Sequence, residues 1–169
     1  MKALLLTFVS ICLMRRGPEI VPTHPLFLGL VTLANAMASL LLLMQMQASV
    51  PVLGGLTYVF VTLVTSAFVV WFALYLRQLD NRFPATIGAL FGCDLLLTSL
   101  SLALLPIFSA AGEGLTLLLV ALVSIWSIAV AGYILHRALN VSVLAGILLA
   151  LGVSLVSIGI GDLVVGSPG

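Results

Sequence analysis

The chain alternates long apolar runs with short polar connections. Five runs approach the length of a membrane span and contain few charges: residues 26–47, 56–76, 84–108, 115–135 and 141–165. A helix needs roughly 20 apolar residues to cross the hydrocarbon core of a bilayer. The runs are continuously apolar rather than alternating, which favours helices over the strands of a membrane β-barrel. We therefore predict an all-α membrane protein, a five-transmembrane-helix bundle that occupies residues 26–165.

The composition agrees with this fold class and limits the function. Of the 169 residues, 63% are hydrophobic and 7% are charged, whereas a soluble domain is about 25% charged. Six basic and five acidic side chains leave no basic face for nucleic acid. The connections are too short to hold a soluble catalytic domain. The expected partners are the lipid bilayer and other integral membrane subunits or further copies of this chain.

The basic residues predict the orientation. All six fall on one side of the five-span arrangement: Lys2, Arg15, Arg16, Arg77, Arg82 and Arg137. Cytoplasmic connections of membrane proteins carry an excess of Lys and Arg. We therefore expect a cytoplasmic N-terminus and a short external tail at residues 166–169. From the Leu-, Ala-, Val- and Gly-rich composition we expect a bacterial inner membrane, which makes the C-terminus periplasmic.

Residues 1–25 form a separate N-terminal segment. The run "ALLLTFVSICLM" is too short to cross a bilayer, ends at Arg15-Arg16 and is followed by no small-residue cleavage site. We predict a short interfacial helix on the cytoplasmic face of the membrane. The alternative is a helix packed against the bundle. Three prolines, Pro18, Pro22 and Pro25, then delay helix formation until the first span.

Asp94 lies in the middle of the third apolar run. It is ten residues beyond Pro84, which corresponds to a depth of about 15 Å in a helix. A charge near the bilayer midplane costs several kcal/mol, so such a residue is expected to face the bundle interior. There it either finds polar partners or stays protonated.

Polar residues at matching depth on other spans are the candidate partners. Counting inward from the same side predicts one buried midplane layer, made of Asp94, Asn35, Ser66, Trp126 and Ser127. In a structural interpretation the layer fixes the helix register, each hydrogen bond contributing about 0.5–2 kcal/mol. In a functional interpretation Asp94 is a proton or cation site in a transport path.

Two stripes of small residues predict close approaches between helices. Gly88 and Gly92 are four apart on the third span. A longer stripe on the fifth span consists of Ala150, Ser154, Ser157 and Gly161. Small side chains of this kind let membrane helices pack closely.

The remaining polar residues carry weaker signals. One group at the cytoplasmic side forms either solvated loops or a docking surface for a partner: Arg77, Asp80, Arg82, His136 and Arg137. Cys12 and Cys93 lie in apolar runs without a paired spacing, which indicates neither a disulfide framework nor a metal site. The sequence contains no Ser/His/Asp set, no paired carboxylates and no phosphate-binding glycine loop. We therefore expect a protein that is not an enzyme, with no cofactor and no metal.

Three segments carry a resemblance to a known family: "RRGPEIVPTHPLFLGL", "NRFPATIGALFGCD" and "WSIAVAGYILHRALN". Together with the overall layout, they resemble the small bacterial YIP1-like membrane proteins. The resemblance implies a short cytoplasmic helix, five spans and no known catalysis. Eukaryotic YIP1 proteins bind small GTPases through a long N-terminal region. Only about 25 residues precede the first span here, so that partner is not expected.

Three functional hypotheses follow, in this order. The first is an accessory, scaffold or assembly subunit of a larger membrane complex, which predicts a small-residue face that the bundle leaves unfilled. The second is a minimal transporter or channel protein that uses Asp94. The third is a lipid- or membrane-organising protein of YIP1-like type that works through its N-terminal helix.

Overall fold

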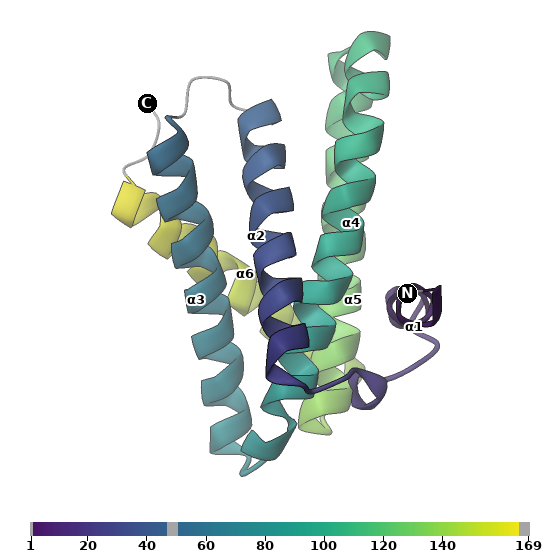
Figure 1. Cartoon of the computed structure of the whole chain (residues 1–169), viewed down its shortest axis with the longest axis vertical. Helices are drawn as coiled ribbons and strands as arrows, with labels where there is room; N and C mark the ends of the chain where they lie inside the picture. The colour runs from purple at the N-terminus through teal and green to yellow at the C-terminus, as the bar shows by residue number, and fades with distance from the viewer. Residues whose placement is uncertain (1, 47–50, 166–169) are drawn as a thin grey trace.

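The computed structural model describes residues 2–46 and 51–165, and helices are the one kind of regular secondary structure in this part of the chain (Figure 1). Five of its helices are long and apolar enough to cross a membrane. They are α2 (Pro25–Met46), α3 (Val52–Leu76), α4 (Phe83–Ala111), α5 (Glu113–Leu139) and α6 (Val143–Val165). The predicted bundle of five transmembrane helices is confirmed. Residue 47, the expected end of the first span, and the expected external tail at 166–169 lie outside the described residues.

Three short helical elements complete the described part of the chain. They are α1 (Lys2–Cys12) at the N-terminus and two 3-10 turns, η1 (Pro18–Ile20) and η2 (Asp80–Arg82). Helix α1 ends well before α2 begins, because Pro18, Pro22 and Pro25 oppose a continuous helix through this stretch.

Proline, glycine and asparagine set the ends of the long helices. Pro51 caps the start of α3, which begins four residues earlier than the apolar run predicted. Gly112 separates α4 from α5 with φ 126°, a backbone conformation that suits glycine. Asn140 ends α5 in the left-handed conformation, φ 52°, which asparagine tolerates better than most residues. These breaks allow sharp reversals without long loops.

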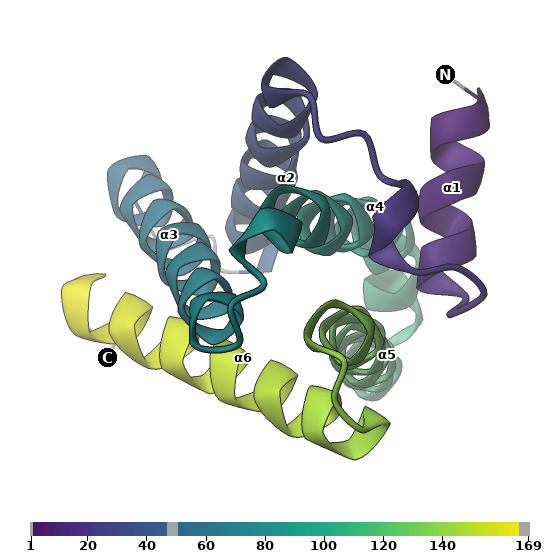
Figure 2. The same cartoon turned by 90° about the horizontal axis from the view of Figure 1, so that it is seen from below.

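The helices do not all run in the same direction. Helices α2 to α5 follow the long axis of the molecule, whereas α6 crosses α3 and α5 obliquely (Figures 1 and 2). At the α5–α6 crossing, Gly146 lies against the carbonyl oxygen of Gly132, so the two backbones are in contact. At the other end of α6, Gly161 lies against the ring of Tyr58 on α3. The small-residue stripe of α6 therefore packs within this chain.

Helix α1 packs across α4 and α5 (Figure 2). Phe8, Ile11 and Cys12 are buried in one cluster with Ala89 and Cys93 of α4 and with Val130 and Ile134 of α5. The outward side chains here are also apolar: Leu6 and Val9 of α1 are exposed, and so is Leu13 directly after it. A helix at the membrane surface normally presents a polar face to water. The described packing is thus that of a helix held against the bundle, and the interfacial position remains a prediction.

Candidate functional site

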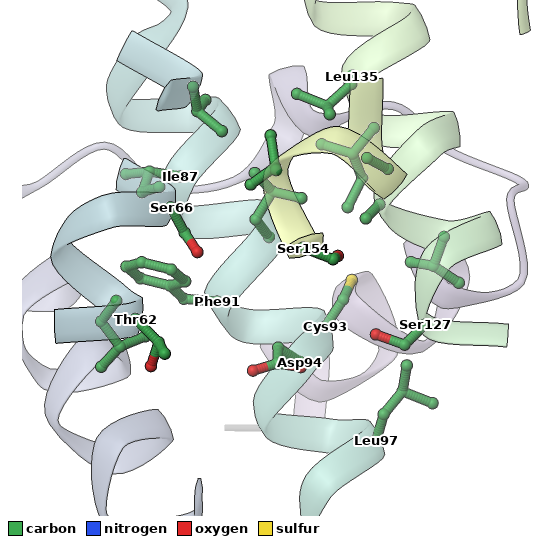
Figure 3. A pocket seen from close by; sticks show the side chains of 18 of the residues that line it. Thr62, Ser66, Ile87, Phe91, Cys93, Asp94, Leu97, Ser127, Leu135 and Ser154 are labelled. Carbon is green, nitrogen blue, oxygen red and sulfur yellow. The ribbon is translucent and has the colours of Figure 1, made fainter. Parts of the chain in front are cut away.

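A cavity of about 230 Å³ lies inside the bundle, with walls from all five long helices (Figure 3). Most of its lining is apolar. Its polar lining consists of the Asp94 carboxyl group, the Cys93 thiol and the hydroxyls of Ser39, Thr62, Ser66, Ser127 and Ser154. One water occupies about 30 Å³ in the liquid, so the space is larger than a single buried water requires.

Asn35 holds one oxygen of Asp94. The Asn35 amide nitrogen Nδ2 donates a hydrogen bond of 3.1 Å to Asp94 Oδ2. The two residues meet because α2 and α4 both start at the same end of the bundle and run in the same direction (Figure 1). Residues that are equally far from the starts of the two helices therefore lie at the same depth in the bundle. The contact that the sequence predicted is therefore present. Asp94 Oδ1 has no hydrogen-bond partner among the described residues.

The Asn35 side chain suits either protonation state of Asp94. Asn35 is fully buried. Among the buried side-chain oxygen and nitrogen atoms of the described residues, Asn35 Oδ1 is the one that has no hydrogen-bond partner. An amide offers both a donor and an acceptor. It donates to an ionised carboxylate and, after a flip, accepts from a protonated one. Asn35 therefore stabilises Asp94 without fixing its charge.

The hydroxyl groups around Asp94 fall into two kinds. Ser66 of α3 bonds Ser157 of α6 at 2.8 Å, and Thr62 Oγ1 donates to the Val59 carbonyl of its own helix at 3.0 Å. The hydroxyls of Ser39, Ser127 and Ser154 line the cavity and have no hydrogen-bond partner among residues 2–46 and 51–165. Buried polar groups are nearly always paired. Free hydroxyls that face a cavity are thus suited to water or to a polar ligand.

Two members of the predicted polar layer do not behave as expected. Trp126 is 45% exposed and lies outside the cavity lining, so its assignment to a buried layer is wrong. Successive side chains of a helix point about 100° apart. Ser127 therefore faces the cavity, whereas Trp126 beside it does not. Ser66 lines the cavity with Asp94, but its hydrogen bond joins α3 to α6 rather than reaching Asp94.

The two cysteines meet, which the sequence did not predict. The Cys12 thiol lies 4.0 Å from the Cys93 carbonyl oxygen, and the Cys93 thiol lies 3.9 Å from the Phe8 carbonyl oxygen. Both cysteines are free and buried. Their contact joins α1 to the wall of the cavity. The two cysteines are 81 positions apart in the sequence, and nothing in that spacing indicated that they would meet.

The residues of the predicted docking surface gather at one end of the bundle, where α3 and α5 end and α4 begins. Four of them are exposed: Arg77, Asp80, Arg82 and Arg137. Arg82 Nη1 donates a long hydrogen bond of 3.4 Å to the carbonyl of Ala138. His136 is half-buried, and its Nδ1 atom forms a hydrogen bond with the carbonyl oxygen of Val141. Its side chain therefore closes the α5–α6 turn rather than forming part of an open surface.

Among the described residues, no three His, Cys, Asp or Glu side chains come together in a way that suits a metal ion. Comparison with family models, curated proteins and solved structures finds no match to this chain. The resemblance to YIP1-like proteins therefore remains an expectation from the sequence.

Proposed function

We propose that this chain is a small membrane transporter whose solute-binding site is the cavity at Asp94. One observation carries the proposal: a carboxyl group in the middle of a spanning helix faces a cavity rather than a filled core. A residue that only fixes helix register is best served by full hydrogen bonding and close packing. Here one carboxyl oxygen and three hydroxyls of the cavity lining have no partner among the described residues.

An accessory-subunit role, the first hypothesis from the sequence, has less support. That hypothesis expects small-residue faces that await a partner helix. Instead, Gly88 lies against Leu28 and Val21, and Gly92 lies against Phe8. Ala150, Ser157 and Gly161 of α6 are also buried within this chain. Gly152 and Gly159 of α6 do have open space beside them, which lipid chains fill as readily as a partner helix does.

A membrane-organising role through the N-terminal helix also has less support. That role needs a segment that is free to engage the bilayer surface. The side chains of Phe8 and Ile11 are instead part of the bundle core. Deletion of α1 would remove that packing and uncover Gly92.

We further propose that the N-terminus lies in the cytoplasm of a bacterial cell and that the protein spans the inner membrane. The location of Arg77, Arg82 and Arg137 at one end of the bundle supports this orientation. The opposite end, at the α4–α5 turn, carries Glu113 and no Lys or Arg among the described residues.

Cysteine labelling tests whether water reaches the cavity, as transport requires. Ser127→Cys is introduced into a Cys12→Ala/Cys93→Ala background, so that the new thiol is the only one. Right-side-out and inside-out vesicles are then treated with a positively charged, membrane-impermeant methanethiosulfonate reagent. We expect rapid modification of Ser127→Cys from at least one side, because Ser127 lines the cavity.

Ser157→Cys is the matched control. Ser157 lies on the adjacent part of α6, is 4% exposed and lies outside the cavity lining. It should react far more slowly than Ser127→Cys. Equal protection of both thiols from both sides would mean a dry cavity and would contradict the transporter proposal.

A further inference from the structure

The cavity can carry charge of only one sign. Among the described residues, Asp94 is the one acidic side chain in its lining, and this lining includes no Lys, Arg or His. Electrostatic attraction is stronger in surroundings of low dielectric constant than in water. A solute that enters this space is therefore selected for positive charge, and an anion would meet repulsion with no compensating cation.

The cavity lining suits an organic cation better than a bare metal ion. A hard cation needs about six oxygen ligands around one point. The hydroxyls here are spread over four helices: Ser39 on α2, Thr62 and Ser66 on α3, Ser127 on α5 and Ser154 on α6. The rest of the lining is mainly aliphatic, which is typical of sites for small organic molecules.

Phe91 adds an aromatic surface one turn before Asp94 on the same helix. It is buried, and its ring borders the cavity (Figure 3). Aromatic faces attract cations that are shielded from water. The cavity thus combines a carboxylate, an aromatic ring, free hydroxyls and aliphatic walls.

We propose that the cavity binds small organic ammonium ions in exchange for a proton on Asp94. This inference rests on the proposed function and names its substrate class. When the ammonium ion enters, the Asp94 O–H bond breaks and the proton leaves to water. The carboxylate keeps the electron pair of that bond and pairs with the intact ammonium group. When the ammonium ion leaves on the other side, a proton from water re-forms the O–H bond.

Asn35 and the cavity hydroxyls have the hydrogen-bonding groups that both states of Asp94 in this cycle require. Asn35 donates to the ionised carboxylate and accepts from the protonated acid, as its amide allows. The Asp94 carboxylate pairs with the charge of any ammonium ion, and the free hydroxyls of Ser39, Ser127 and Ser154 accept hydrogen bonds from those ammonium ions that carry N–H groups. One ammonium ion is therefore exchanged for one proton, and the Asp94 carboxylate is neutralised either by the proton or by the ammonium ion.

Ligand binding by the purified full-length protein in detergent tests the substrate class. The probe is benzylammonium, and benzyl alcohol is a neutral molecule of nearly the same shape. We expect saturating benzylammonium to raise the melting temperature by about 5 °C or more. We also expect binding at least about tenfold tighter than that of benzyl alcohol. In weakly buffered solution, benzylammonium should release protons.

Two variants assign these effects to the cavity. Asp94→Asn removes the exchangeable proton and should abolish both the stabilisation and the proton release. Ser154→Leu fills part of the cavity and leaves Asp94 in place, so it should also abolish binding. This second variant keeps the test decisive where Asp94→Asn does not fold.

Three results would overturn the inference. They are equal stabilisation by benzyl alcohol, equal stabilisation by sodium chloride at the same concentration, and unchanged binding in a folded Asp94→Asn or Ser154→Leu variant. Labelling of Ser127→Cys distinguishes a failure of the proposed substrate class from a failure of the proposed transport function. Rapid labelling with no preference for benzylammonium rejects only the substrate class, whereas a protected Ser127→Cys rejects the proposed function itself.

Discussion

At the scale of single residues, the site is built around the hydrogen bond between Asn35 and Asp94. Counting residues from the start of each helix was enough to predict it, because α2 and α4 run in the same direction from the same end of the bundle. The same counting failed for Trp126, because a count gives depth along a helix and not the side that faces inward. Trp126 and Ser127 have nearly the same depth, yet only Ser127 lines the cavity.

Asn35→Leu tests the energy of this pair. The substitution removes the donor to Asp94 Oδ2 and leaves a carboxyl group inside the bundle without its partner. We expect a loss of about 1–3 kcal/mol in the free energy of unfolding, measured by denaturant unfolding in detergent. In an Asp94→Leu background the same substitution should cost much less, because there is no carboxyl group left to satisfy.

Thr32→Val is the control on the same helix. Thr32 Oγ1 donates to the Leu28 carbonyl of α2, at 2.8 Å, rather than to another helix. Its replacement should change stability by about 0.5 kcal/mol or less. A loss for Asn35→Leu no larger than that for Thr32→Val would show that the pair contributes nothing to folding.

At the scale of helices, the spans were predictable and their contacts were not. Continuous apolarity is a strong signal for a membrane helix, and five of the described helices match it. It also removes the amphipathic pattern that normally shows which face is buried. For α1, whose inner and outer faces are both apolar, the sequence could not show that Phe8 packs on Gly92.

Gly146→Ala tests the contact between α5 and α6. An added Cβ would meet the carbonyl oxygen of Gly132, and it would lie 2.9 Å from both Cβ and the backbone nitrogen of His136. Backbone atoms cannot move aside as a flexible side chain does, so we expect a loss of about 1–3 kcal/mol of stability. Thermal unfolding in detergent measures it.

Gly159→Ala on the same helix provides the comparison. Nothing lies within 4 Å of the Cβ it would add. Replacing a glycine inside a helix by alanine stabilises the helix by roughly 0.5–1 kcal/mol. The two substitutions should therefore change stability in opposite directions, and equal effects would mean that α5 and α6 do not touch at Gly146.

At the scale of the whole molecule, the central feature is the cavity. No sequence pattern indicates a cavity, because it arises where the side chains of several helices fail to fill the space between them. Its polar lining comes from residues far apart in the sequence, such as Thr62, Asp94 and Ser154. Only Asp94, which breaks an otherwise apolar run, gave a sequence signal strong enough to suggest a site.

Measurement of proton-coupled exchange in proteoliposomes tests most directly whether the protein exchanges organic cations for protons at Asp94. Liposomes that contain the protein are loaded with benzyltrimethylammonium and the pH indicator pyranine, then diluted into medium without the cation. The probe has a permanent charge, so it cannot cross the bilayer as a neutral base. As it leaves through the wild-type protein, protons should enter and acidify the interior, while liposomes with Asp94→Asn should match empty liposomes. Acidification at the same rate with wild type and Asp94→Asn, or none with wild type, would contradict exchange at Asp94.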